Sequence, residues 1–201
     1  QFFRQNFAQV TTPPIDSLRE RHVMSLRTRF ANLANILEEE DQNDNVLVLE
    51  SPILMSSEWY RLRIGFGEKV GTIDCTFAAG GGAAALREAI ERIRNEAEAM
   101  AKGKQAEIFL TDEGTGPDRV GVPMILAAAA VHTHLTRKGL RSFTSINVRS
   151  AECLDTHTLA VLIGVGATTV NPYLAEAALA SRHARGLYGD MTLAKVLANF
   201  R

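Results

Sequence analysis

The stretch from Ala130 to Ala175, AVHTHLTRKGLRSFTSINVRSAECLDTHTLAVLIGVGATTVNPYLA, decides the fold of this 201-residue chain. It starts in an alanine-rich helical pattern that ends at Gly139, because glycine is the usual residue just beyond a helix. A strand pattern over Ser142–Val148 follows, then a second apolar helix that reaches Ile163. The short strand Thr168–Val170 comes next. The stretch is therefore one strand–helix unit that runs into another.

The same alternation extends toward the N-terminus. Val70–Phe77 alternates apolar and polar residues, which predicts a strand, and Ala83–Lys102 has apolar residues at helical spacing. Ala106–Leu110 predicts another strand, and Pro123 opens the helix that ends at Gly139. Strands alternating with helices indicate an α/β fold with parallel strands and right-handed crossovers. Residues 70–201 thus read as repeated βα units, either a partial β/α barrel or a Rossmann-like sheet.

The N-terminal segment, residues 1–64, has a different pattern and is expected to be a mostly helical lead-in. A capping-box pattern predicts a helix that ends near Phe30. A short strand follows over Val46–Leu49, and Ser56 or Ser57 is expected to cap a short helix.

Composition narrows the class of protein. Apolar residues make up 46% of the chain, so residues 1–201 can supply a core as part of one domain. The net charge of −1 gives no electrostatic basis for binding nucleic acid or an anionic membrane. No apolar run reaches the roughly 18 residues needed to span a bilayer, and the two cysteines favour a reducing, cytoplasmic compartment. Both ends lie in apolar patterns. The chain is therefore expected to be a piece of a longer polypeptide, able to self-associate through surfaces that its neighbours would cover.

The candidate ligand residues follow successive predicted strands. They are Asp112, Glu113, Arg149, Glu152 and Asn171. In parallel α/β folds, ligands bind beyond the carboxyl ends of the strands, so these side chains mark the best candidate edge for a small molecule. Loops at this edge are polar in any soluble α/β protein, with or without a ligand. The alternative to a small-molecule site is therefore an edge that only contacts solvent.

Other motifs give weaker signals. Gly80–Gly82 lies between a strand and a helix, but it matches neither the dinucleotide fingerprint nor the P-loop. His132 and His134 are two residues apart on a helix, so they point to opposite faces and cannot chelate one metal. We expect them to pack and to hydrogen-bond to neighbouring backbone. Cys75 is predicted within a strand, and no specific base beside it is implied. No catalytic, cofactor-binding or metal-binding residue is predicted.

Charge spacing on the helix over Ala83–Lys102 also predicts ion pairs. Glu88–Arg92 and Arg94–Glu98 are four residues apart, which favours pairing on the solvated side.

Four longer segments carry a resemblance to a known family. They are Gln9–Leu26 (QVTTPPIDSLRERHVMSL), Leu49–Leu54 (LESPIL), Ala129–Arg141 (AAVHTHLTRKGLR) and His157–Ala175 (HTLAVLIGVGATTVNPYLA). In order and spacing the chain resembles the central domain of the glutamate synthase large subunit. Thr12, Thr133, Thr156 and Val165 depart from the family pattern, and these changes disfavour any role that needs a full histidine cluster.

The resemblance implies a place in L-glutamate biosynthesis. The parent enzyme, an oxidoreductase, releases ammonia from glutamine at an N-terminal cysteine and passes it through a tunnel to a flavin-bearing barrel. There it reacts with 2-oxoglutarate. FMN and an iron–sulfur cluster serve this reaction, with NADPH or ferredoxin as the electron source. The central domain links the reactive domains and helps to form the ammonia tunnel. Its implied partners are the other domains of the same chain and a small subunit.

The residues themselves leave other functions open. The chain has no N-terminal cysteine and only two cysteines, so we expect no catalysis and no bound cofactor in this piece alone. The alternative is a free-standing half-barrel that binds a small anionic ligand, either at Gly80–Gly82 or at the edge marked by Asp112 and Arg149. A third possibility is an interaction module with no part in a tunnel.

Overall fold

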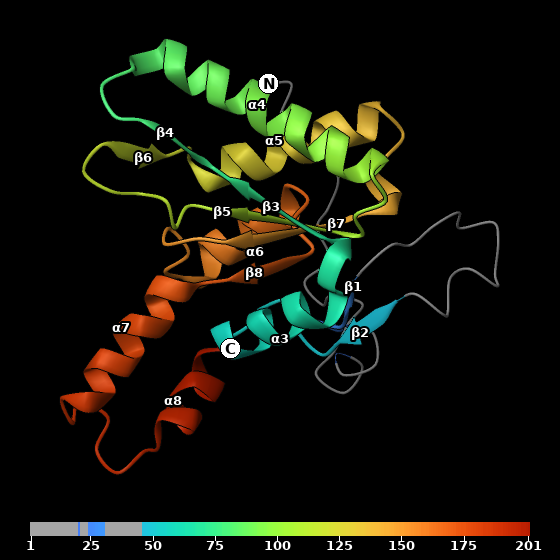
Figure 1. Ribbon diagram of the computed structural model, residues 1–201. Coiled ribbons are helices and arrows are strands. Elements are labelled where there is room, and N and C mark those ends of the chain that lie inside the picture. Colours follow the sequence, from blue (N-terminus) through green and yellow to red (C-terminus); the bar gives the residue numbers. More distant parts are fainter. Residues whose placement is uncertain (1–19, 21–23, 31–45) are drawn as a thin grey trace, which may run out of the picture.

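The computed structural model describes residue 20, residues 24–30 and residues 46–201 (Figure 1). A four-stranded parallel sheet forms its centre, in the order β3 (Val70–Asp74), β5 (Glu107–Thr111), β7 (Ser145–Arg149) and β8 (Thr169–Asn171). The predicted α/β class is confirmed. Each strand lies beside the one before it in the chain, as in a segment of a β/α barrel. A Rossmann-like sheet would instead reverse its strand order at a switch point.

Three helices connect these strands and share one face of the sheet. They are α4 (Gly82–Lys102), α5 (Met124–Arg137) and α6 (Thr156–Gly164), with α5 packed against both of its neighbours (Figure 1). Right-handed crossovers between strands in sequential order place every connecting helix on the same side. Two further helices, α7 (Tyr173–Ala184) and α8 (Leu193–Phe200), follow the last strand and pack on each other.

The segment before the sheet contains strands as well as helix. β1 (Thr28–Phe30) pairs antiparallel with β2 (Leu47–Leu49), and α3 (Ser56–Phe66) and the 3₁₀ turn η1 (Gly67–Lys69) lead into β3. The prediction of a helix ending near Phe30 is wrong at that end, because Phe30 is drawn into a buried aromatic cluster as part of a strand. The start of that predicted helix lies outside the described residues.

The strand predicted over Val70–Phe77 is two strands. Beyond Cys75 the chain leaves the parallel sheet, and β4 (Thr76–Ala78) pairs antiparallel with β6 (Arg119–Gly121). The turn is fixed by Asp74, whose carboxylate accepts a hydrogen bond from the backbone N–H two residues on, at 3.0 Å. Alternation of apolar and polar residues continues through the turn, so periodicity alone does not reveal it. In the same way, the 3₁₀ turn η2 (Arg141–Phe143) replaces the start of the strand predicted from Ser142.

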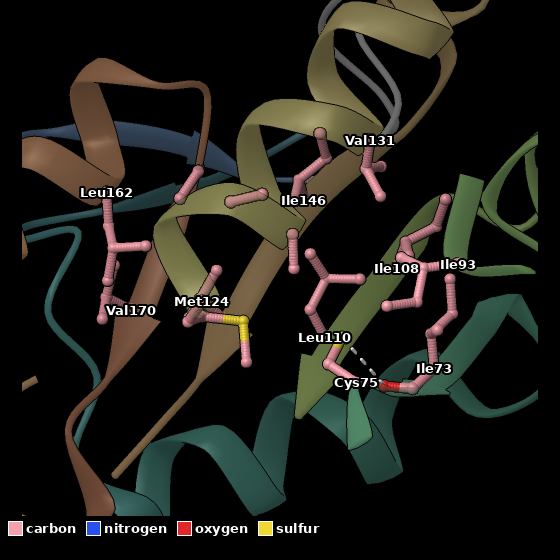
Figure 2. Close-up of a cluster of buried hydrophobic side chains, with 14 of the residues drawn as sticks. Ile73, Cys75, Ile93, Ile108, Leu110, Met124, Val131, Ile146, Leu162 and Val170 are labelled. Carbon is pink, nitrogen blue, oxygen red and sulfur yellow. Dashed lines mark hydrogen bonds between the residues drawn. The ribbon is translucent and has the colours of Figure 1, made fainter. Parts of the chain in front are cut away.

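The main core lies between the sheet and its helices (Figure 2). Strand side chains that point toward the helices meet apolar side chains from α4, α5 and α6: Ile73, Ile108, Leu110, Ile146 and Val170 against Ile93, Met124, Val131 and Leu162. The stripe predicted on α4 is confirmed, since Ile93 and Ala97 are buried and Leu86, Ile90 and Met100 pack against the core.

A second, aromatic core covers the opposite face of the sheet. Phe109 points there because side chains alternate along β5, between Ile108 and Leu110. It contacts Trp59 of α3 with ring centroids 5.1 Å apart, and Phe30 closes the cluster from β1. The N-terminal segment is therefore anchored to the sheet by packing.

The ion pairs predicted on α4 are replaced by others. Arg92 pairs with Glu96 at 3.1 Å, and Arg94 pairs with Glu91 at 2.5 Å. Across the described part of the chain, no helix combines the length and the apolar character needed to cross a membrane.

Candidate functional site

The carboxyl ends of three neighbouring strands bring most of the predicted edge residues together. The register of the parallel sheet aligns Thr111 with Arg149 and Arg149 with Asn171. Asp112 and Glu113 follow directly after β5. Four of the five predicted residues therefore form one group, which we call the edge cluster: Asp112, Glu113, Arg149 and Asn171.

Asp112 is an acceptor at the centre of this edge. Its side chain is buried and accepts from the Ser150 hydroxyl at 2.6 Å, from the Ala151 backbone N–H at 3.0 Å, and from the Tyr173 hydroxyl at 2.9 Å. Burial, together with the charge of Asp112, raises the pKa of Tyr173 far above its usual value. Asp112 thus ties the loop after β7 and the start of α7 to the end of β5.

Arg149 is the cation of the edge cluster, and its side chain is buried among other residues of the chain. Its guanidinium lies over three aromatic rings, with its carbon 4.8 Å from the Trp59 centroid, 5.3 Å from Tyr60 and 4.9 Å from Tyr173. Stacking of this kind is worth about 0.5–2 kcal/mol for each good contact, more when the cation is desolvated.

Hydrogen bonds complete the hold on Arg149. Its Nη1 donates to the Asn171 side-chain oxygen and to the Ser56 hydroxyl, the latter at 3.2 Å. Its Nε lies 2.9 Å from the half-exposed carboxylate of Glu113, which makes an ion pair but lacks the geometry of a hydrogen bond. The Asn171 amide in turn donates to the Leu54 carbonyl at 2.7 Å. The cluster therefore links β7 and β8 to α3, across 93 residues of sequence.

Glu152 lies apart from the edge cluster and contacts a different element. Its carboxylate accepts from the Met124 backbone N–H at 2.8 Å, at the first residue of α5. Another carboxylate, Glu176 of α7, accepts from the Ser56 N–H at 2.8 Å at the start of α3. Both carboxylates occupy N-terminal helix ends, where unpaired N–H groups and the helix dipole favour a negative charge.

The aromatic partners of the edge cluster were not predicted from the sequence. Trp59 is the only tryptophan of the chain, and Tyr173 follows the Asn171–Pro172 step directly. These facts could have singled out Trp59 and Tyr173 as candidates. Nothing in the spacing of the sequence, however, indicates that both rings contact Arg149.

A row of polar side chains crosses the sheet nearer its amino end. The Asn147 amide donates to Glu107 at 2.7 Å, and the Thr169 hydroxyl donates to the Asn147 side-chain oxygen at 2.7 Å. All three are buried. Burial raises the pKa of Glu107 to about 9, with the Asn147 bond opposing the shift. Glu107 is therefore a neutral carboxylic acid at pH 7, a feature absent from the predictions.

The Gly80–Gly82 loop adopts a conformation that needs glycine. Gly80 and Gly82 have φ values of +84° and +61°, in the left-handed region. A hollow of about 390 Å³ between β4 and α4 is lined in part by Arg92 and Arg119, but none of the three glycines is among its lining residues. Both guanidinium groups already donate to oxygens of Asp74 or Thr76.

His132 and His134 point in different directions, as their spacing predicts. The His134 Nε2 lies 2.6 Å from the Glu98 carboxylate, which also binds Lys102 at 2.6 Å. Those two contacts, the lysine first, lower the pKa of Glu98 to about 2. The expected hydrogen bonding of His134 to backbone is thus replaced by a carboxylate contact between α4 and α5.

His132 contacts a buried arginine. The Arg141 Nε donates to His132 Nδ1 at 3.1 Å, and its Nη2 donates to the Gly166 carbonyl at 2.8 Å. Burial first, and the charge of Arg141 second, lower the pKa of His132. Gly166 has φ +116°, and a Cβ there would come within 2.3 Å of the His132 ring. This corner admits glycine only.

Neither cysteine has the environment of a nucleophile. Cys75 lies between β3 and β4 rather than within a strand, and both Cys75 and Cys153 are buried and unpaired. Burial raises the pKa of each thiol to about 12, so neither is a thiolate at neutral pH. Over residues 20, 24–30 and 46–201, no group of three or more histidine, cysteine or carboxylate side chains is placed to hold a metal ion.

Comparison with known proteins relates the chain to one family. The family described as the glutamate synthase central domain matches residues 1–201. The chain is 58% identical over 200 residues to the glutamate synthase [NADPH] large chain of Azospirillum brasilense, which covers 100% of this chain and 13% of that protein. It is 38% identical over 177 residues to the ferredoxin-dependent glutamate synthase of Spinacia oleracea (87% and 11%). It is 39% identical over 182 residues to glutamate synthase [NADH] of Schizosaccharomyces pombe (89% and 9%). The chain thus spans only a small part of these relatives.

Proposed function

Since this chain belongs to the glutamate synthase central domain family, we propose that it is a structural unit of a glutamate synthase large chain. In this role it links the part that releases ammonia from glutamine to the part that makes glutamate from 2-oxoglutarate. It also helps to wall the passage between them. The catalytic residues and cofactors for both reactions belong to other parts of the same polypeptide.

The internal pairing of the edge cluster carries this proposal. In a ligand-binding α/β protein the carboxyl edge of the sheet presents free polar groups. Here Arg149 is enclosed by three rings and bound to Asn171 and Glu113. Asp112 is occupied by the loop after β7 and by Tyr173. These contacts favour an edge that joins α3, α7 and the sheet into one rigid body over one that holds an anionic ligand.

Rigidity suits a domain that aligns a passage for ammonia. Ammonia in bulk water at neutral pH is protonated and unreactive, so its transfer needs a dry, continuous route between two sites. An edge whose charges are paired internally keeps its shape and places no loose ionic group in such a route.

The donor set of the chain also favours chemistry located elsewhere. An iron–sulfur cluster takes cysteine thiolates as ligands, and the only two cysteines here are buried thiols. The two cysteines therefore do not fit an iron–sulfur cluster, and we assign no residue of this chain to FMN. We expect FMN, the cluster and the nicotinamide or ferredoxin electron source to act on other domains or on a small subunit of a cytoplasmic enzyme.

The test is a coupling measurement in an intact large chain that carries Arg149→Met. Loss of the guanidinium loosens the joint among α3, β7 and β8. We expect the amount of glutamate formed per glutamine hydrolysed to fall, with free ammonia released, while glutamate formation from added ammonia is retained. Arg63→Met is the matched control, because Arg63 also lies over Trp59, at 5.4 Å, but on the exposed side of α3.

An unchanged ratio in a folded Arg149→Met protein would refute the alignment role. If that variant does not fold, Tyr60→Leu serves in its place, because it removes one ring over Arg149 and leaves the hydrogen bonds of Arg149 with Ser56 and Asn171 intact. The purified 201-residue chain should show no turnover of glutamine or 2-oxoglutarate. Titration of it with FMN, 2-oxoglutarate and glutamine tests the alternative, since binding tighter than about millimolar, or about −4 kcal/mol, would favour a ligand site.

A further inference from the structure

The outer surface between α4 and α5 contains a shallow groove with an apolar end and a cationic end. It has a volume of about 270 Å³ and is lined by Arg94 of α4 and by Leu126, Ala129, Ala130, Thr133, His134 and Arg137 of α5. We call it the α4–α5 groove. It lies on the side of the helix layer away from the sheet, apart from the edge cluster.

The lining residues of α5 form one continuous stripe. Leu126, Ala130, Thr133 and Arg137 follow each other at spacings of three or four, which places them on one face of the helix. Leu126 is 41% exposed, and Thr133 and Arg137 are exposed as well. No element among residues 46–201 covers this face of α5, whose buried face is the opposite one, with Met124, Ala127 and Val131.

Small side chains at the centre of the stripe make the groove. Ala129 and Ala130 keep the surface low between Leu126 at one end and Arg137 at the other. The distance between packed helices depends on the side chains at their contact, so alanines allow a second backbone to approach closely. The volume lies just below the roughly 300–1,000 Å³ of small-molecule pockets, which favours side chains of a packed segment as the occupant.

The cationic end is partly fixed in place. Arg94 bonds Glu91 at 2.5 Å, and its second nitrogen lies 3.3 Å from His134 Nδ1, so its guanidinium is already ordered. The exposed side chain of Arg137 forms no hydrogen bond or ion pair with a described residue, whereas Lys138 beside it lies 3.6 Å from the Glu98 carboxylate. Glu98 is taken up by His134 and Lys102. An approaching carboxylate would thus meet two guanidinium groups, one of them preorganised.

We propose that the α4–α5 groove seats a segment of the same long polypeptide, one that places an acidic side chain between Arg94 and Arg137 and small or apolar side chains over Ala129, Ala130 and Leu126. The inference rests on the proposed function, in which this chain holds neighbouring parts of a large chain together. Relatives extend far beyond the matched region, since this chain covers only 13% of the Azospirillum protein. Such a protein has ample further sequence to supply the segment.

The test compares thiol labelling at Thr133→Cys in the 201-residue chain and in an intact large chain. Both native cysteines of the 201-residue chain are buried, so a maleimide reports on the new thiol there with little background. In the intact chain, whose other domains carry further cysteines, the label is quantified by mass spectrometry on the peptide that contains position 133. We expect labelling to be at least ~10-fold slower in the intact chain, because the reagent must wait for local opening of the covered surface. Ala99→Cys, exposed on α4 and outside the groove, is the matched control for reagent access.

Charge reversal tests the acidic contact. Adding Arg137→Glu to Thr133→Cys should restore fast labelling in the intact chain, whereas Arg87→Glu, an exposed position of α4 outside the groove, should not. Equal labelling of Thr133→Cys in both proteins would overturn the proposal. So would protection that survives Arg137→Glu, or protection of the 201-residue chain that rises with its own concentration, which would indicate a second copy.

Failure of this inference is separate from failure of the proposed function. Suppose that Thr133→Cys is labelled equally fast in both proteins while Arg149→Met still lowers coupling in the large chain. The linking role would then stand, and the contact with the rest of the polypeptide would lie on another face.

Discussion

Replacing Glu107 by glutamine should remove a loss of stability that the wild-type chain suffers as the pH rises from 4.5 to about 9. Glu107 is fully buried, and burial raises the pKa of its carboxyl from its usual 4.5 to about 9. At pH 7 the folded chain therefore carries a neutral acid, while the unfolded chain carries an ionised one. Glutamine has nearly the shape of the neutral acid and can accept the same hydrogen bond from Asn147, yet it has no proton to titrate.

The size of the effect follows from proton linkage. Below pH 4.5 both states hold the proton, so the contribution of Glu107 to stability is fully present. Between pH 4.5 and about 9 only the folded state holds it, and stability falls by about 1.4 kcal/mol per pH unit. Glu107→Gln lacks this slope. The stability gap between the variant and the wild type should widen by about 3 kcal/mol from pH 5 to pH 7.

Urea unfolding at pH 5, 6, 7 and 8 measures this gap. Trp59 is the only tryptophan and is buried against Phe109, so its fluorescence reports on unfolding. Glu68→Gln is the matched control, because Glu68 is exposed, and its gap to the wild type should stay constant with pH. A Glu107→Gln gap that does not widen between pH 5 and pH 7 would show that the carboxyl titrates normally and that the reasoning is wrong.

Three further substitutions test other contacts. Arg149→Met should lower the free energy of unfolding by about 1–3 kcal/mol, measured in urea, because it leaves the buried side-chain oxygen of Asn171 without its donor; a loss below about 1 kcal/mol would contradict the joint. Glu152→Ala should cost about 1 kcal/mol through the lost contact with the Met124 N–H, and equal stability by thermal melting would remove its capping role. Gly166→Ala should cost about 3 kcal/mol or more, because its Cβ would overlap the His132 ring in a left-handed backbone; a normal melting temperature would contradict that geometry.

The candidate edge was predictable as a set of residues but not as a network. Asp112, Glu113, Arg149 and Asn171 all follow strands, and parallel strands end at one edge, so their convergence follows from the alternating pattern. Glu152 shares that position in the sequence, yet it turns toward α5. The conformation of the loop decides toward which element such a side chain points. Because loops have no periodic pattern, the sequence does not predict that direction.

The charge pairs of α4 show the same limit. Spacing of four residues makes a pair possible on a helix, and several pairs compete for the same side chain. Glu98 is drawn to His134 on the neighbouring helix, and Arg94 pairs backward with Glu91. The partner depends on which groups the next helix supplies.

By itself the sequence determined the α/β class and the buried stripe of α4. Both features arise from periodicity, which the order of residues specifies directly. Tertiary structure alone decided the sequential strand order, the break at Cys75, the enclosure of Arg149 and the neutral state of Glu107. Each of these depends on groups brought together from distant parts of the chain, and the burial that changes a charge or closes a cluster exists only after the layers have packed.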